Sequence, residues 1–377
     1  MAYCGYCGKF IADGYLFCSH CGRPVNNTKN AGQSTPEEPI SQSSDYKSNS
    51  SSSFVGGIND YIGNSNPVQL NWKDLFSDVF KKHTDEEAED IFICGTSKTT
   101  PPLDKVSETW PKPWLYSRVF LCFAITYVLL NICWTQFQNT NVLPGLIIVG
   151  SFAVPFTTMV LFMEVNAFRN ISVYEVMKFF LIGGCASLVV TLFIYSLRLV
   201  DTSVASTWGA MMVGVIEELG KLAIVYVLIS KMKSCNNILG ALLVGACVGA
   251  GFAAFESAGY AFNVLLDRGI NGMTNTIYLR GLLAPGGHVA WAAISGAALV
   301  IAKGPNPLTT DVLANKQFLK IFVIPVVLHG LWDAPILPGY PKWIALIVVV
   351  WIVVLILINM GLDEVKKLKQ NQDETMQ

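Results

Sequence analysis

The sequence predicts an all-α polytopic membrane protein with about eight transmembrane helices and a small zinc ribbon at its N-terminus. Hydrophobic residues make up 52% of the 377 residues and charged residues only 14%, whereas soluble globular proteins carry about 25% charged residues. From Trp114 to Leu362 the apolar residues form repeated runs of about twenty, the length that crosses roughly 30 Å of hydrocarbon as a helix. This composition excludes a soluble enzyme. The near balance of 26 basic and 27 acidic residues gives no indication of a nucleic-acid partner.

Two pairs of cysteines predict the zinc ribbon, which we place at residues 1–26. The spacing of two CxxC knuckles presents four thiolates to one structural Zn²⁺, and the four ligands are Cys4, Cys7, Cys18 and Cys21. The sequence opens without the pattern of a secretory signal peptide, so we expect a cytosolic N-terminus with reduced thiols. The alternatives are two disulfides in a secreted segment, or His20 as a ligand in the second knuckle.

The segment between the ribbon and the membrane divides into two parts. Residues 27–70 are rich in Ser, Asn, Gln, Gly and Pro, a composition that predicts a disordered linker. Residues 71–113 are predicted to form cytosolic amphipathic helices and a Pro-rich connector. Thr84-x-x-Glu87 has the pattern of a capping box that opens the second of these helices.

Residues 114–362 contain the predicted membrane domain, and residues 363–377 form a cytosolic tail. The predicted spans are 116–134, 142–163, 176–197, 207–230, 238–262, 281–303, 318–337 and 343–361. An even number of spans places both termini on one side of the membrane. Lys366, Lys367 and Lys369 mark that side as cytosolic by the positive-inside rule, which leaves the loop near Arg268 outside.

The carboxylates and imidazoles in the middle of the spans are confined to spans four to seven, where one lysine accompanies them. Each costs on the order of 3 kcal/mol at the centre of a bilayer and therefore needs a partner or a function. They are Glu217, Glu218, Lys221, Glu256, His288, His329 and Asp333.

Helical geometry predicts that these residues meet. His329 and Asp333 are four residues apart and share a helix face, as do Glu217 and Lys221, whereas Glu218 points about 100° away from Glu217. Counted from the predicted outer ends at 1.5 Å per residue, four of them lie roughly 9–15 Å below the outer surface, namely Glu217, Glu256, His288 and His329. Such a layer is suited to general acid–base catalysis or to activation of water by a metal.

This polar layer could instead serve a structural or a transport role. Histidines in spans often make only helix–helix hydrogen bonds, and Glu–Lys pairs often only neutralise each other, as in a non-catalytic scaffold or sensor that acts through its zinc ribbon. Transporters also carry intramembrane carboxylates and histidines. The sequence shows neither an inverted repeat nor the pair of broken spans that is typical of transporters.

The residues of the polar layer form four motifs that appear in order on separate helices of spans four to seven. They are Glu217-Glu218-x-x-Lys221, Phe252-x-x-x-Glu256, His288 ahead of Trp291, and His329-x-x-x-Asp333. As a set, these motifs resemble the PrsW family of bacterial intramembrane proteases, which are distant relatives of the CAAX prenyl endopeptidases. The resemblance covers about 130 residues.

The resemblance implies cleavage of a single-span membrane protein, with anti-sigma factors as the familiar substrates, near the outer face of a bacterial cell membrane. It implies that Glu217 or Glu218 activates water, while His329 and Asp333 polarise the scissile carbonyl with help from His288. Glu256 stands where the CAAX relatives use a histidine, so the question whether the active site binds a catalytic metal stays open. The zinc ribbon is outside the family core and is expected to bind a cytosolic protein partner.

Overall fold

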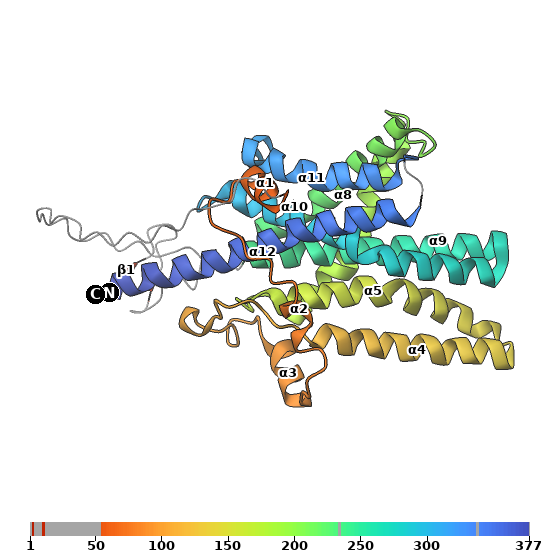
Figure 1. Cartoon of the computed structure of the whole chain (residues 1–377), viewed down its shortest axis with the longest axis horizontal. Coiled ribbons are helices and arrows are strands. Elements are labelled where there is room, and N and C mark those ends of the chain that lie inside the picture. The colour runs from red at the N-terminus through yellow and green to blue at the C-terminus, as the bar shows by residue number, and fades with distance from the viewer. Residues whose placement is uncertain (1, 4–9, 12–53, 233–234, 337–338, 377) are drawn as a thin grey trace, which may run out of the picture.

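The computed structural model describes residues 2–3, 10–11, 54–232, 235–336 and 339–376, and their regular secondary structure is almost entirely α-helical (Figure 1). Two short strands, β1 (Ala2–Tyr3) and β2 (Phe10–Ile11), pair antiparallel near the N-terminus. The all-helical class predicted from the sequence is confirmed. The four cysteines of the predicted zinc ribbon lie outside the described residues.

Helix α1 (Phe54–Ile62) lies within the segment predicted to be a disordered linker, so that prediction was wrong for its last part. The physical reason is local: apolar side chains recur along this helix, and Ile62 is fully buried. The carbonyl of Ile62 accepts a hydrogen bond from Gln317, and Asn66 donates to Asp363 over 3.0 Å. These contacts fix α1 and the turn after it on the helices that contain Gln317 and Asp363.

The predicted capping box before α3 (Asp85–Ile93) is confirmed. The Thr84 hydroxyl accepts from the Glu87 backbone N–H at 3.2 Å, and the Glu87 carboxylate accepts from the Thr84 N–H at 3.3 Å. Helix α2 (Asp74–Ser77) is a single turn. A connector with one 3₁₀ turn, η1 (Leu103–Lys105), leads from α3 to the membrane helices.

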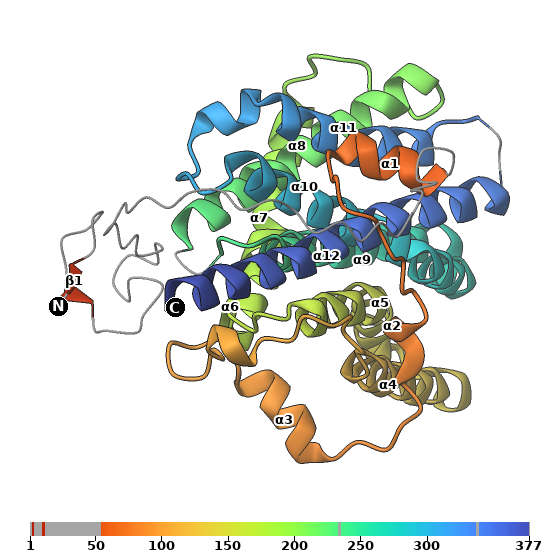
Figure 2. The same cartoon turned by 60° about the vertical axis from the view of Figure 1, so that its left-hand side comes forward.

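The membrane domain consists of helices, most of them long, joined by turns and short loops. They are α4 (Leu115–Phe137), α5 (Leu143–Val165), α6 (Val173–Lys178), α7 (Gly184–Ser196), α8 (Thr207–Lys231), α9 (Ile238–Leu283), α10 (His288–Lys303), α11 (Lys316–Asp333) and α12 (Tyr340–Met376). Shorter turns are η2 (Thr140–Val142), the π turn η3 (Phe179–Gly183) between α6 and α7, η4 (Ala284–Gly286) and η5 (Thr310–Ala314). Helices α8 to α11 pack against one another, while α4 and α5 lie to one side of α9 (Figures 1 and 2).

Helix α9 reverses direction at Gly269, where the sequence predicted an external loop. Gly269 has φ 69° and ψ −169°, a backbone conformation available essentially only to glycine. The segment after Gly269 returns along the segment before it, as the ion pair between Arg280 and Glu256 shows. The chain does turn where the loop was predicted, but the loop is much shorter than expected, because the returning segment is itself apolar and its Met273 and Ile277 pack on Ala261.

Five stretches of the described residues are long and apolar enough to cross a membrane. They are Leu115–Phe137, Thr140–Val165, Val173–Ser196, Ile238–Lys303 and Tyr340–Glu374. The fourth stretch contains two of the predicted spans. Helices α8 and α11 are not among the five, since each carries three or more charged residues, although they pack inside the helical bundle. The protein is a multi-pass membrane protein.

Candidate active site

The structure brings together all seven ionisable residues that the sequence singled out. Helix α8 contributes two carboxylates and the lysine, α9 one carboxylate, α10 a histidine, and α11 a histidine and a carboxylate. They are Glu217, Glu218, Lys221, Glu256, His288, His329 and Asp333, and each has a side-chain contact with another member of the set. Their clustering shows how residues more than 100 positions apart come to share one chemical environment.

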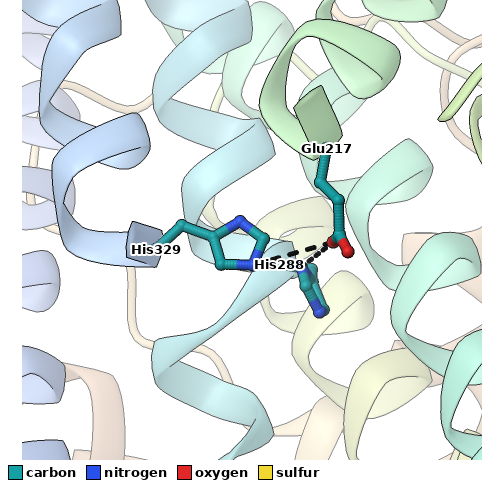
Figure 3. Close-up of side chains that lie close together, drawn as sticks. All are labelled: Glu217, His288 and His329. Carbon is teal, nitrogen blue, oxygen red and sulfur yellow. Dashed lines mark ion pairs between the residues drawn. The ribbon is translucent and has the colours of Figure 1, made fainter. Parts of the chain in front are cut away.

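Glu217 faces both histidines, as Figure 3 shows. Its Oε2 atom lies 3.6 Å from Nε2 of His329 and 4.0 Å from Nδ1 of His288. Oε2 is buried and has no hydrogen-bond partner, which is rare for a buried carboxylate oxygen. The three donor atoms of this group lie within 4.8 Å of one another, so they could hold one metal ion.

The outer nitrogen of each histidine contacts a carboxylate. His288 Nε2 lies 3.0 Å from Glu256, and His329 Nδ1 lies 2.8 Å from Glu218. When His288 Nε2 and His329 Nδ1 carry the proton and donate it to these carboxylates, the other nitrogen of each ring, which faces Glu217, keeps a lone pair. Metal-binding histidines are commonly oriented in this way, by a carboxylate on the nitrogen away from the metal.

Lys221 lies fully buried between two of these groups. Its Nζ is 2.6 Å from Glu218 Oε1 and 2.8 Å from His288 Nδ1, and it lies 4.5 Å above the ring of Phe252. The contact with Glu218 balances a carboxylate that has no exposed surface. The contact with His288 Nδ1 uses the same lone pair that a metal would need, so metal binding requires this one hydrogen bond to open.

A cavity of about 650 Å³ borders the cluster. Glu217, His288, His329 and Asp333 line it, whereas Glu218 and Lys221 lie behind its wall. The carboxylate of Asp333 approaches to 3.5 Å from His329 Nε2. Of the two adjacent glutamates, Glu217 is therefore the one that a substrate in the cavity can reach.

Three further residues shape the site, and the sequence reasoning assigned a role to none of them. The Tyr195 hydroxyl of α7 donates to Glu217 Oε1 at 3.2 Å. Arg280 binds Glu256 from the returning half of α9, and Trp291 stacks on His329 with ring centroids 4.4 Å apart. The position of Trp291, three residues after His288, was the one signal visible in the sequence.

Close contact between helix backbones sets these distances. A Cβ atom at Gly249 of α9 would collide with the backbone of His288, and one at Gly214 of α8 would lie 2.7 Å from the Gly330 nitrogen of α11. The helices can therefore approach only because both positions lack a side chain. His288 and His329 are placed by these two contacts.

Residues 173–359 match the family described as PrsW family intramembrane metalloprotease, and the matched range contains the whole cluster. The chain belongs to the PrsW family. It is also similar to the protease PrsW of Clostridioides difficile (strain 630), with 26% identity over 203 residues that cover 51% of this chain and 79% of that protein. No solved structure matches the chain.

Membership of the PrsW family and the buried donor set together identify an intramembrane metalloprotease. The residues present fit a metal: Glu217, His288 and His329 supply one oxygen and two nitrogens, a donor set that divalent transition metals accept. The unpartnered Oε2 of Glu217 is the atom that a cation would satisfy. The catalytic metal that the sequence left open therefore has a possible site.

Proposed function

We propose that the protein hydrolyses a peptide bond of a membrane-anchored protein substrate, with a metal ion held by Glu217, His288 and His329. The observation that carries the proposal is the buried, unpartnered Glu217 Oε2, which faces a nitrogen of each histidine. A buried carboxylate oxygen without a hydrogen-bond partner is rare, and a cation between Glu217 Oε2 and the two imidazoles would satisfy it. When bound, the metal would polarise the scissile carbonyl and acidify a water molecule.

The surrounding residues have distinct roles in this proposal. Glu218 and Glu256 hold the two imidazoles in one tautomer and orientation. Tyr195 donates to Glu217 Oε1 and so directs the other oxygen toward the histidines. Asp333 borders the cavity and is the carboxylate left to accept a proton from the attacking water.

The lining of the cavity favours a substrate that arrives through the bilayer. Leu188 and Leu192 of α7 line one side, and Leu279 and Leu283 from the returning half of α9 line another. Leu192 is 63% exposed on the outside of the helical bundle. A spanning segment next to the cleavage site could pack on these apolar side chains, as expected for a single-span regulatory protein of the anti-sigma-factor type.

We further propose that eight helical segments cross the bacterial cell membrane and that both termini are cytosolic. Three basic residues lie at helix ends on one side of the bundle, and Arg169 lies in the turn after α5 on the same side. The three are Lys231, Lys303 and Lys316, and together the four support a cytosolic assignment of that side. The polar cluster then lies toward the outer face. Reporters fused after Gln377 and inserted at Gly269 should report opposite sides, and identical signals would contradict this topology.

The zinc ribbon belongs to the proposal as a separate structural Zn²⁺ site that binds a cytosolic protein partner. A test of the catalytic metal must exclude this second site. In a background in which serine replaces Cys4, Cys7, Cys18 and Cys21, the purified chain in detergent should contain one metal ion. Elemental analysis measures this directly.

Glu217→Gln in that background tests the function. The change nearly conserves volume and removes one anionic ligand, so the metal should be lost and cleavage of a single-span substrate should fall by several orders of magnitude. Glu86→Gln on the exposed surface of α3 is the matched control and should change neither. A Glu217→Gln chain that cleaves at the control rate would refute the proposal, and an active background chain without metal would refute the metal's role.

A further inference from the structure

A second cavity, of about 530 Å³, lies between the connector that precedes α4 and the end of α5. It shares no lining residue with the cavity of the active site. The connector contributes Lys105, Trp110 and Lys112 to its wall, and the end of α5 and the turn after it contribute Glu164, Asn166 and Arg169. This cavity has no role in the chemistry proposed above.

Its charge is positive. Lys105, Lys112 and Arg169 are exposed, and none of them forms an ion pair with a described side chain. The acidic residue in the wall is Glu164, whose carboxylate accepts the backbone N–H groups of Trp114, Leu115 and Tyr116 at 2.8–2.9 Å. Glu164 thus compensates the positive N-terminal end of α4, and the three basic side chains are left to attract an external anion.

One residue that lines this cavity carries a buried acceptor. Asn166 is only 1% exposed, and its Nδ2 donates to Asn170 at 3.0 Å. Its Oδ1 is buried without a hydrogen-bond partner. A ligand that fits the cavity should therefore combine an anionic group with a hydroxyl or another donor.

The position of the cavity points to a lipid. The candidate spans Leu115–Phe137 and Thr140–Val165 both end at the cavity, which places it at the membrane interface. Trp110 and Trp114 line it, and tryptophan is enriched at that depth. No residue in the most apolar part of α4 is buried within the structure, so this helix offers its surface to acyl chains.

We propose that this cavity binds the headgroup of an anionic phospholipid that carries a free hydroxyl, with phosphatidylglycerol as the simplest example. Lys105, Lys112 and Arg169 attract the phosphate. Asn166 Oδ1 accepts a hydrogen bond from the headgroup hydroxyl. The acyl chains extend along α4, where the unpaired apolar surface faces the bilayer.

The test is native mass spectrometry of the full-length protein in micelles that contain phosphatidylglycerol and phosphatidylcholine in equal amounts. The wild type should retain phosphatidylglycerol in preference to phosphatidylcholine. It should also prefer phosphatidylglycerol over phosphatidylmethanol, which has the same charge but no headgroup hydroxyl. Added glycerol phosphate should not displace the bound lipid, because the soluble anion lacks acyl chains.

Variants then locate the site. Lys105→Gln/Lys112→Gln/Arg169→Gln should weaken retention by about a hundredfold, the effect expected for loss of three interfacial basic residues. The matched control, with the same change in charge, is Lys73→Gln/Lys82→Gln/Lys231→Gln, none of which lines the cavity.

Several results would overturn the proposal. Equal retention of phosphatidylcholine by the wild type would do so, whether or not the variants fold. Displacement by glycerol phosphate would instead indicate a soluble anion. If Lys105→Gln/Lys112→Gln/Arg169→Gln retains phosphatidylglycerol as well as the control variant does, the lipid binds elsewhere.

Discussion

Glu256→Gln tests whether a carboxylate behind His288 prepares the metal site. Glu256 Oε2 lies 3.0 Å from His288 Nε2 and also binds Arg280. A glutamine keeps the volume and can still accept a hydrogen bond, but it provides no negative charge to strengthen the imidazole as a ligand. Loss of such a partner typically lowers metal affinity about 10- to 100-fold, which is roughly 1.4–2.7 kcal/mol.

Arg280 makes the expected effect more specific. In the Glu256→Gln chain its guanidinium loses its carboxylate and stays close to the site, where a positive charge opposes the binding of a dication. Removal of both groups in Glu256→Gln/Arg280→Gln should therefore recover part of the lost affinity. Arg280→Gln alone leaves the carboxylate on His288 and should cost less than Glu256→Gln.

The assay is competition for Zn²⁺ with a chelator of known affinity, in the background without the ribbon cysteines. Glu86→Gln serves again as the matched surface control. A Glu256→Gln chain that holds Zn²⁺ within threefold of the control would refute the reasoning. So would a double variant that binds metal less well than Glu256→Gln.

Three other perturbations have definite expected outcomes. Lys221→Met leaves the buried carboxylate of Glu218 without its cation and should lower the free energy of unfolding by about 3–5 kcal/mol. A denaturant titration that shows a loss of less than about 1 kcal/mol would contradict the structure. Gly249→Ala should displace His288 and reduce both stability and metal affinity. The control Gly259→Ala, with no atom within 4 Å of the added Cβ, should change neither. Equal effects of the two substitutions would show that close packing does not place His288. Burial raises the pKa of the Cys235 thiol from 9.0 to about 12, so alkylation of this thiol at pH 8 should be about a thousandfold slower in the folded than in the unfolded chain. The free energy of unfolding should also fall as the pH rises from 9 to 12, because only the unfolded chain loses this proton. Rapid labelling of Cys235 in the folded chain at pH 8 would contradict this prediction.

The helices of the membrane domain were predictable, but their turns were less so. Apolar runs near the length of a bilayer are conspicuous in sequence, and helices lie at each predicted position. The sequence predicted a loop near Arg268, whereas the chain stays helical on both sides of Gly269 because the two arms bury each other's apolar side chains. Such a tertiary contact between neighbouring segments leaves no local signal.

The members of the site were easier to predict than their pairings. Ionisable residues inside apolar spans are rare, which is why Glu217 and His329 were found. Which glutamate faces the cavity depends on the rotation of α8, and this is set by packing against other helices. Tyr195 has no mark that distinguishes it from an interfacial tyrosine, and Arg280 was assigned to an outer loop.

The pair formed by Glu218 and Lys221 within α8 has a consequence for how the chain is synthesised. Glu218 and its other partner His329 are 111 residues apart, so at about 5–20 residues per second α8 is made roughly 6–22 s before α11. A lone glutamate would resist entry into the bilayer during this interval, at a cost of about 3 kcal/mol. Lys221 is three residues away on the same helix, so its charge is available as soon as the nascent segment becomes helical. The nascent helix thus carries its own counter-ion into the membrane, before α9 to α11 are made.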